Sequence, residues 1–229
     1  MSVEDVKREL ATEGPIQLTG YPAYVRGCSR EILEWFSKFN DVLLEHITEF
    51  DQGKKVVLLT VCSYAKPYSH SFIHYGIRKA LFEAELLDEI EYWHLSSAGV
   101  IPSCMEEEVP YCCYDWNNAH ATEDDLRALR EYLEDHYLHW LKQYISPLKK
   151  SVVTYFRPES NTRQAIDRVI YRPSETPVIH VEPTRRRSTK YTCASLLGEY
   201  ADPDGLLLHT HNLRYLVDSI YARIGVQHD

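Results

Sequence analysis

The most constraining feature of this 229-residue sequence is an apolar run, KKVVLLTV at residues 54–61. Strands that are covered on both faces read as continuous hydrophobic runs, whereas half-exposed strands alternate apolar and polar residues. Residues 54–61 are therefore predicted to form a buried strand of a parallel sheet. A helical pattern follows at 73–90, and EYWHLSS at 91–97 predicts the next strand. This strand–loop–helix–strand order is the building block of parallel sheets.

The same alternation of helices and strands extends over most of the chain. A capping box, in which Thr122 is followed three residues later by Asp125, predicts the start of a long helix that runs to about Ile145. Residues 98–121 are predicted to be a polar loop, and residues 1–28 an extended lead-in. The other expected elements are helices at 29–50, 161–171 and 212–224 and strands at 151–156 and 176–182. The expected fold is a single α/β domain over residues 1–229, with three layers and a mainly parallel sheet.

The charge and the composition narrow the classes of partner. The formal net charge is −9, and the strongest basic cluster, PTRRRSTKYT at 183–192, is short. Phosphate neutralisation supplies much of the affinity for nucleic acid, so this balance argues against a strong stand-alone binder but leaves room for a local patch. No apolar stretch is long enough to predict a membrane span, and the charged N-terminus lacks a secretory h-region. With six cysteines in a chain of this length, we expect a cytoplasmic protein with reduced thiols.

The loop after the first predicted strand is rich in reactive side chains, and residues 61–74 read VCSYAKPYSHSFIH. Ligands of parallel α/β sheets bind outside the carboxyl ends of the strands, where this loop lies. Cys62 is a nucleophile if nearby positive charge lowers its pKa, or otherwise a small apolar filler at a strand end. Lys66 either binds an anion or is solvated, and Tyr68 either stacks on a planar base or covers the core. The residues alone leave these alternatives open.

The segment CSYAKPYSHSFIH at 62–74 resembles the motif of the archaeosine synthase core domain, in which Cys, Lys-Pro-Tyr, Ser and His recur at these spacings. Three further elements of that family follow in the same order: IRKAL at 77–81, SSAGVIP at 96–102 and PYCCYD at 110–115. Two positions depart from the family pattern, because Val61 stands where the family tends to have Pro and Cys113 where it tends to have His. The resemblance covers roughly residues 50–155.

The resemblance implies a fold similar to uracil-DNA glycosylases and an enzyme that attaches lysine to the nitrile carbon of 7-cyano-7-deazaguanine in tRNA. Archaeosine synthases also carry a transglycosylase-like portion and an RNA-binding PUA domain, for which this chain has no room. The expected partner is therefore a tRNA, DNA or nucleotide that contains the 7-deazaguanine, and a transglycosylase-like or PUA-bearing subunit is a further candidate. Neither a metal nor a cofactor is expected, and no membrane is expected as a partner.

The resemblance also implies catalytic roles for loop residues. Attack of Cys62 on the nitrile would give a thioimidate, which an amine then displaces to leave an amidine. His74 or His70 would move protons, and His74 fits the motif position better. Ser69 and Ser71 would donate hydrogen bonds to the developing nitrogen anion. In the direct alternative there is no covalent step, and Lys66 and His74 only orient the amine and the nitrile.

Four residues are expected to hold the substrate together with Ser69. Tyr68 is expected at the base, Asp115 is expected to accept from its guanine-like N1–H and amino group, and Ser97 and Gly99 are expected to form a backbone wall beside it. Two other functions remain open at this point. One is a glycosylase-like nucleobase hydrolase, which would need a carboxylate or amide near loop 62–74, although the loop itself has none. The other is a non-catalytic base-binding subunit of a modifying complex.

Overall fold

The computed structural model describes residues 25–26, 28–63, 66–108, 111–112, 114–116, 120–170, 178–183 and 203–225. Its centre is a five-stranded sheet with the order β4-β3-β2-β6-β7. The strands β2, β3, β6 and β7 are parallel, and β4 pairs antiparallel with β3 at one edge. The bounds of these strands are β2 Val56–Val61, β3 Ile90–Ser96, β4 Gly99–Pro102, β6 Ser151–Tyr155 and β7 Val178–Val181.

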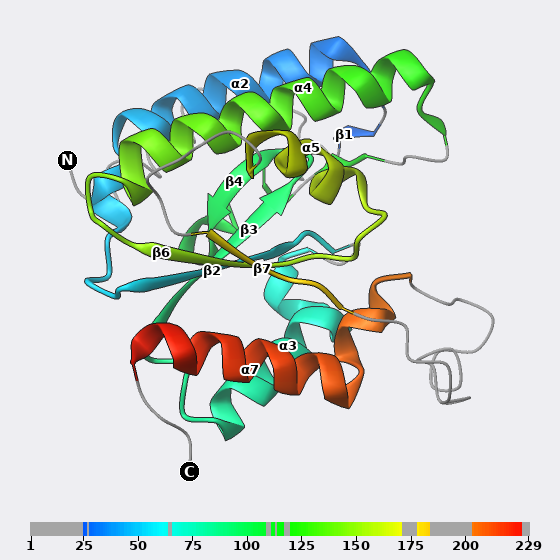
Figure 1. The fold of residues 1–229 in the computed structure, drawn as a ribbon. Coiled ribbons are helices and arrows are strands. Elements are labelled where there is room, and N and C mark those ends of the chain that lie inside the picture. The colour runs from blue at the N-terminus through cyan, green and yellow to red at the C-terminus, as the bar shows by residue number, and fades with distance from the viewer. Residues whose placement is uncertain are drawn as a thin grey trace.

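Helices cover both faces of this sheet, so that the described part of the chain forms three layers (Figure 1). The helices α2 (Arg30–Glu45), α4 (Glu123–Trp140) and α5 (Asn161–Ile170) lie on one face, and α3 (Phe72–Glu83) and α7 (Thr210–Ile224) lie on the other. Short helical segments join them at η1 Ile47–Phe50, η2 Tyr68–His70, η3 Ser103–Met105, η5 Leu141–Ile145 and η6 Pro203–Leu208. Within the described ranges, no helix is long and apolar enough to cross a membrane.

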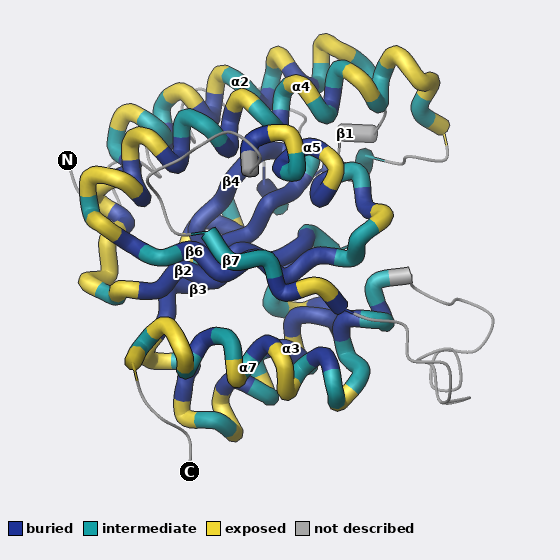
Figure 2. Tube along the Cα trace, viewed as in Figure 1, coloured by how far each residue is buried: buried dark blue, intermediate teal, exposed yellow. Residues whose placement is uncertain are grey.

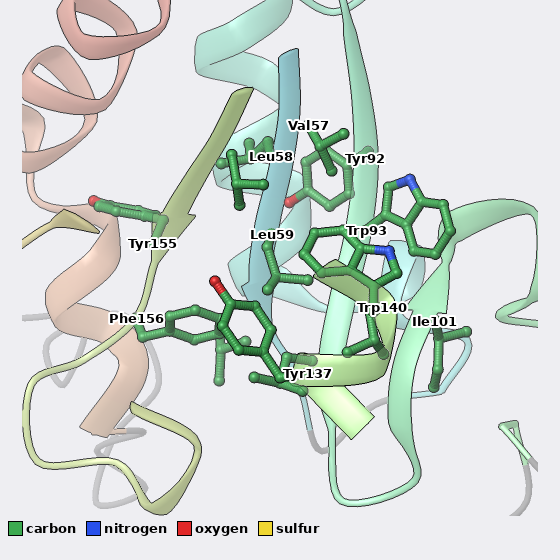
Figure 3. Packing of buried hydrophobic residues seen from close by; sticks show 14 of the residues in the cluster. Val57, Leu58, Leu59, Tyr92, Trp93, Ile101, Tyr137, Trp140, Tyr155 and Phe156 are labelled. Carbon is green, nitrogen blue, oxygen red and sulfur yellow. The ribbon is translucent and has the colours of Figure 1, made fainter. Parts of the chain in front are cut away.

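Burial follows the sheet, because every residue of β2 and β3 is buried while the helices keep exposed outer faces (Figure 2). On the α4 side, Trp93 of β3 packs against Trp140, with 5.6 Å between ring centroids (Figure 3). Side chains alternate between the faces of a strand, so the polar side chains of Tyr92, His94 and Ser96 point to the α3 side. This alternation places a row of polar groups beneath the loop that follows β2.

The prediction of an α/β fold with a mainly parallel sheet is confirmed. The capping box at the start of α4 is also present. The Thr122 side chain accepts the Asp125 backbone N–H, and the Asp125 side chain accepts the Thr122 backbone N–H. The prediction that residues 98–121 form only a loop is wrong. A turn at Gly99, whose φ is +112°, reverses the chain after β3, and the buried residues GVIP then add β4 to the sheet edge.

Two predictions concern the chain before α2 and the division into domains. Of the predicted lead-in, residues 1–24 lie outside the described residues. Val25–Arg26, within the lead-in, form β1, which pairs parallel with β5 (Tyr114–Asp115). The basic cluster lies outside the described residues from 184 onward. The single domain over residues 1–229 remains a prediction.

Candidate functional site

The motif loop begins at the carboxyl end of β2, which lies between β3 and β6 in the sheet. In the register of these strands Val61 is opposite Leu95, and Thr60 is opposite Tyr155. Cys62 therefore emerges beside the turn that follows β3 and beside Arg157, which follows β6. The carboxyl ends of three parallel strands meet here, as in ligand sites of other open α/β sheets.

The thiol of Cys62 is partly buried against the core. Burial raises its pKa, the Lys66 ammonium opposes this increase, and Asp204 adds to it. The backbone N–H of Ser97 hydrogen-bonds the sulfur and favours its thiolate form. At neutral pH the resting group is therefore the protonated thiol, and its proton must leave when the sulfur attacks an electrophile.

Lys66 and Tyr68 lie together over the start of η2. The Lys66 ammonium is 4.2 Å from the ring centroid of Tyr114 and 5.9 Å from that of Tyr68. The hydroxyl groups of Tyr68 and Tyr114 are 2.7 Å apart. Tyr68 is fully buried, so the structure favours its role in the core, while its contact with a substrate base remains a prediction.

The structure places Ser71 and His74 beneath the loop, at the start of α3. Ser71 Oγ is the N-cap of this helix and accepts the backbone N–H of His74 at 3.1 Å. The His74 ring is fully buried, with Nδ1 3.0 Å from the Tyr92 hydroxyl and its plane nearly perpendicular to the His94 ring. Burial and then the neighbouring His94 hold the pKa of His74 well below its usual value, so this imidazole is neutral at pH 7. Ser71 and His74 thus have structural partners in this position, and their roles at the substrate remain predictions.

A carboxylate outside the motif also reaches the loop. Glu106 Oε2 accepts the backbone N–H of Ser69 at 2.9 Å and lies 3.4 Å from His94 Nε2. The His94 ring in turn packs on Tyr68, with 4.6 Å between centroids. Neither Glu106 nor His94 was expected at the site from the sequence. A signal existed for His94, because period-two alternation in EYWHLSS groups it with Tyr92 and Ser96 on one face, whereas Glu106 lies in the segment wrongly assigned to a loop.

The two predicted wall residues differ in what they contact. Ser97 is partly buried, and its backbone N–H faces the sulfur of Cys62. A Cβ at Gly99 would lie 2.7 Å from Asn40 Nδ2, so the close approach that requires glycine here is with Asn40. Asn40 in turn donates to the Ala98 carbonyl and accepts from the Tyr111 hydroxyl, which holds the turn in place.

Asp115 belongs to β5, and its side chain lies outside the described residues. Arg157 Nε donates to Asp204 Oδ1 at 3.1 Å, which ties η6 to the end of β6. Among the described residues, no three His, Cys, Asp or Glu side chains are arranged to hold a metal ion.

Comparisons with known proteins place this site in a family without naming its activity. No curated protein matches the sequence. A solved structure described as "Crystal structure of AF0587, a protein of unknown function" is similar with a TM-score of 0.46 and 17% identity, over 78% of this chain and 49% of that one. The chain therefore spans about half the length of that protein. A family model described as "Domain of unknown function (DUF5591)" matches residues 36–184, which is more than half of the sequence and includes the motif loop, so the chain belongs to this family.

Proposed function

We propose that this chain is an archaeosine-synthase-like enzyme that adds an amine to the nitrile of 7-cyano-7-deazaguanine in tRNA or in a related nucleic acid or nucleotide. The amine is lysine in the family that the motif resembles. The observation that carries the proposal is the position of Cys62, whose sulfur accepts the Ser97 backbone N–H beside Lys66 at the carboxyl end of the central strand. Burial keeps this thiol protonated at rest, but the Lys66 ammonium and the Ser97 N–H favour the thiolate, which is the form that attacks an electrophile.

The covalent route balances without an oxidant or reductant. The S–H of Cys62 adds across the carbon–nitrogen triple bond, the sulfur to carbon and the proton to nitrogen, and this gives a thioimidate. The amine then adds to the same carbon, the carbon–sulfur bond breaks, and the thiol is restored as the amidine forms. Lys66 stabilises the sulfur as it loses its proton, because its positive charge lowers the pKa of Cys62. In the direct route, Lys66 and His74 orient the amine and the nitrile without a bond to sulfur.

The proposal extends to the fold and the partners. A mainly parallel sheet between two helical layers, with the motif loop at the strand ends, supports a likeness to uracil-DNA glycosylases, in which a nucleobase would enter at this edge. The proposed partner is a tRNA, DNA or nucleotide that carries the 7-deazaguanine. A transglycosylase-like or PUA-bearing subunit would then hold a polynucleotide that an acidic chain binds weakly.

A glycosylase-like nucleobase hydrolase is the second candidate, and one observation favours it. Such an enzyme needs a carboxylate to activate water, and Glu106 reaches the motif loop through Ser69 although it comes from another segment. A non-catalytic base-binding subunit is the third candidate. It is suggested by the departures at Val61 and Cys113 from the family pattern.

Mass spectrometry separates these functions. We would incubate the protein with 7-cyano-7-deazaguanine as base, nucleotide and tRNA, with and without lysine. The expected product has gained the mass of one lysine, and Cys62→Ala is expected to lower its rate of formation by roughly a thousand-fold or more, since it removes the nucleophile. Cys104→Ala, at an exposed cysteine, is the matched control and should keep the activity.

The other outcomes are equally informative. Full turnover by Cys62→Ala would exclude the thioimidate and leave the direct route. Release of a free base would identify the hydrolase, and binding without any product would identify the base-binding subunit.

A further inference from the structure

The two carboxylate oxygens of Glu106 are used differently. Oε2 is anchored, because it accepts the Ser69 backbone N–H at 2.9 Å and faces His94 Nε2 at 3.4 Å. Oε1 accepts no hydrogen bond from any residue that the structure describes. It is also not a fully buried atom. The Glu106 side chain is 8% exposed. Because Oε1 is not fully buried, part of this accessible area belongs to Oε1.

Glu106 is ionised in this position. Burial would raise its pKa, but the adjacent His94 imidazole and the hydrogen bond from the Ser69 backbone N–H outweigh burial and lower the pKa below its usual value. An ionised carboxylate only accepts hydrogen bonds, and leaving one of its oxygens unbonded in a buried site is costly. The site therefore presents a fixed acceptor that favours a ligand with N–H donors.

Glu106 and Cys62 are both at the motif loop, because Cys62 begins it after β2 and Glu106 is hydrogen-bonded to its Ser69. Both are close enough to the Tyr68 hydroxyl to raise its pKa, although burial is the main cause of that increase. Ser69, which anchors Glu106, is the next residue along the loop. We therefore expect a flat ligand over this loop to meet the sulfur at one end and the carboxylate at the other.

We infer that Glu106 is a specificity-determining residue, whose second oxygen accepts hydrogen bonds from the N–H edge of the nucleobase. This inference rests on the proposed function. In 7-cyano-7-deazaguanine, N1–H and the 2-amino group lie on the six-membered ring, and the nitrile lies on the five-membered ring. The ligand thus carries its donors and its electrophile at opposite ends, as Glu106 and Cys62 require. Asp115, also expected at this edge of the base, serves as the rival in the test.

The test is a calorimetric comparison of two free bases, 7-cyano-7-deazaguanine and its analogue without the 2-amino group. We expect the unmodified protein to prefer the amino-bearing base by roughly 10- to 100-fold, as a hydrogen bond to a charged group contributes. Glu106→Gln keeps the shape of the side chain but removes the charge, and it should reduce this preference to about 3-fold or less. Glu107→Gln, at the exposed neighbouring residue, is the matched control and should keep the full preference.

The outcomes distinguish this inference from the proposed function. An unchanged preference in Glu106→Gln, together with its loss in Asp115→Asn, would overturn the role of Glu106 while leaving the proposed function intact. If neither base binds the unmodified protein, both proposals fail. Should Glu106→Gln not fold, Glu106→Asp keeps the charge but withdraws the oxygen, and full retention of the preference by this variant would also overturn the inference.

Discussion

Two buried polar groups lie at opposite edges of the same sheet, and they are built in different ways. The amino-edge network consists of Asp51, Glu91, Tyr144 and Lys150, where the Lys150 ammonium is 2.7 Å from Glu91 Oε1, 2.7 Å from Asp51 Oδ1 and 2.7 Å from the Lys54 carbonyl. The carboxyl-edge cluster consists of His74, His94, Tyr92, Tyr68 and Glu106. Its contacts are longer, and Nε2 of both histidines has no well-aligned hydrogen bond among the described residues.

On the function proposed above, the difference separates a structural role from a role at the substrate. Tyr144 also donates to Glu91 at 2.7 Å, so the amino-edge charges are paired and bonded within the protein. Such a network specifies the packing but offers nothing to a ligand. The carboxyl-edge cluster keeps neutral imidazoles and an incompletely bonded carboxylate next to the motif loop. Incomplete bonding in a buried site costs stability, and a role of these groups at the proposed substrate would account for that cost.

Breaking the amino-edge network should have the largest effect on stability. Lys150→Met would leave the Glu91 carboxylate buried without its cation, and we expect the free energy of unfolding to fall by about 3–5 kcal/mol. Urea denaturation measures this loss, with Lys142→Met at an exposed lysine as the matched control. A loss below about 1 kcal/mol would show that the amino-edge network contributes little to stability, contrary to the contrast drawn with the carboxyl-edge cluster.

The second-largest expected effect comes from two glycines, one at each edge of the sheet. Both need a positive φ, but a Cβ at Gly99 would meet Asn40 Nδ2 at 2.7 Å, whereas a Cβ at Gly53 would meet nothing within 4 Å. We expect Gly53→Ala to cost about 1 kcal/mol through the backbone alone and Gly99→Ala about 3 kcal/mol through backbone and collision together. Thermal or urea unfolding of the two variants measures the difference. Equal losses would mean that Asn40 moves aside and does not hold the turn.

The smallest expected effect is a change in the pH dependence of stability. Burial lowers the pKa of His94, and Arg78 lowers it further, while Glu106 acts in the opposite direction. Below about pH 6.5 the unfolded chain binds a proton that folded His94 does not, so stability falls with decreasing pH by up to about 1.4 kcal/mol per pH unit. His94→Leu should remove this part of the slope between about pH 6.5 and the lowered pKa.

Urea denaturation of His94→Leu over this pH range measures that change. His120→Gln, at an exposed histidine, is the control for the loss of an imidazole as such. A slope that stays the same in His94→Leu would show that the imidazole of His94 does not contribute to it.

Much of the fold was predictable because its signals are local. The run at 54–61 became β2. The capping box of Thr122 and Asp125 opens α4, and the helix predicted to run to about Ile145 is α4 followed by η5. The helix predicted at 29–50 is α2, whose N-cap is Ser29, although the Ser29 side chain makes no capping bond. The antiparallel β4 was missed, because four buried residues after a glycine turn carry no periodicity that distinguishes a strand from a loop.

In the candidate site, too, local features were predictable and contacts between distant segments were not. The sequence by itself determined that Cys62, Lys66 and Tyr68 follow a buried strand, since strand order and motif spacing are properties of contiguous residues. Only the tertiary structure decided that Glu106 and His94 join them and that Ser71 caps a helix beneath them. The reason is physical: Glu106 reaches Ser69 across 37 residues of chain, through a turn and an edge strand, and hydrogen bonds between such distant segments exist only once the sheet has brought them together.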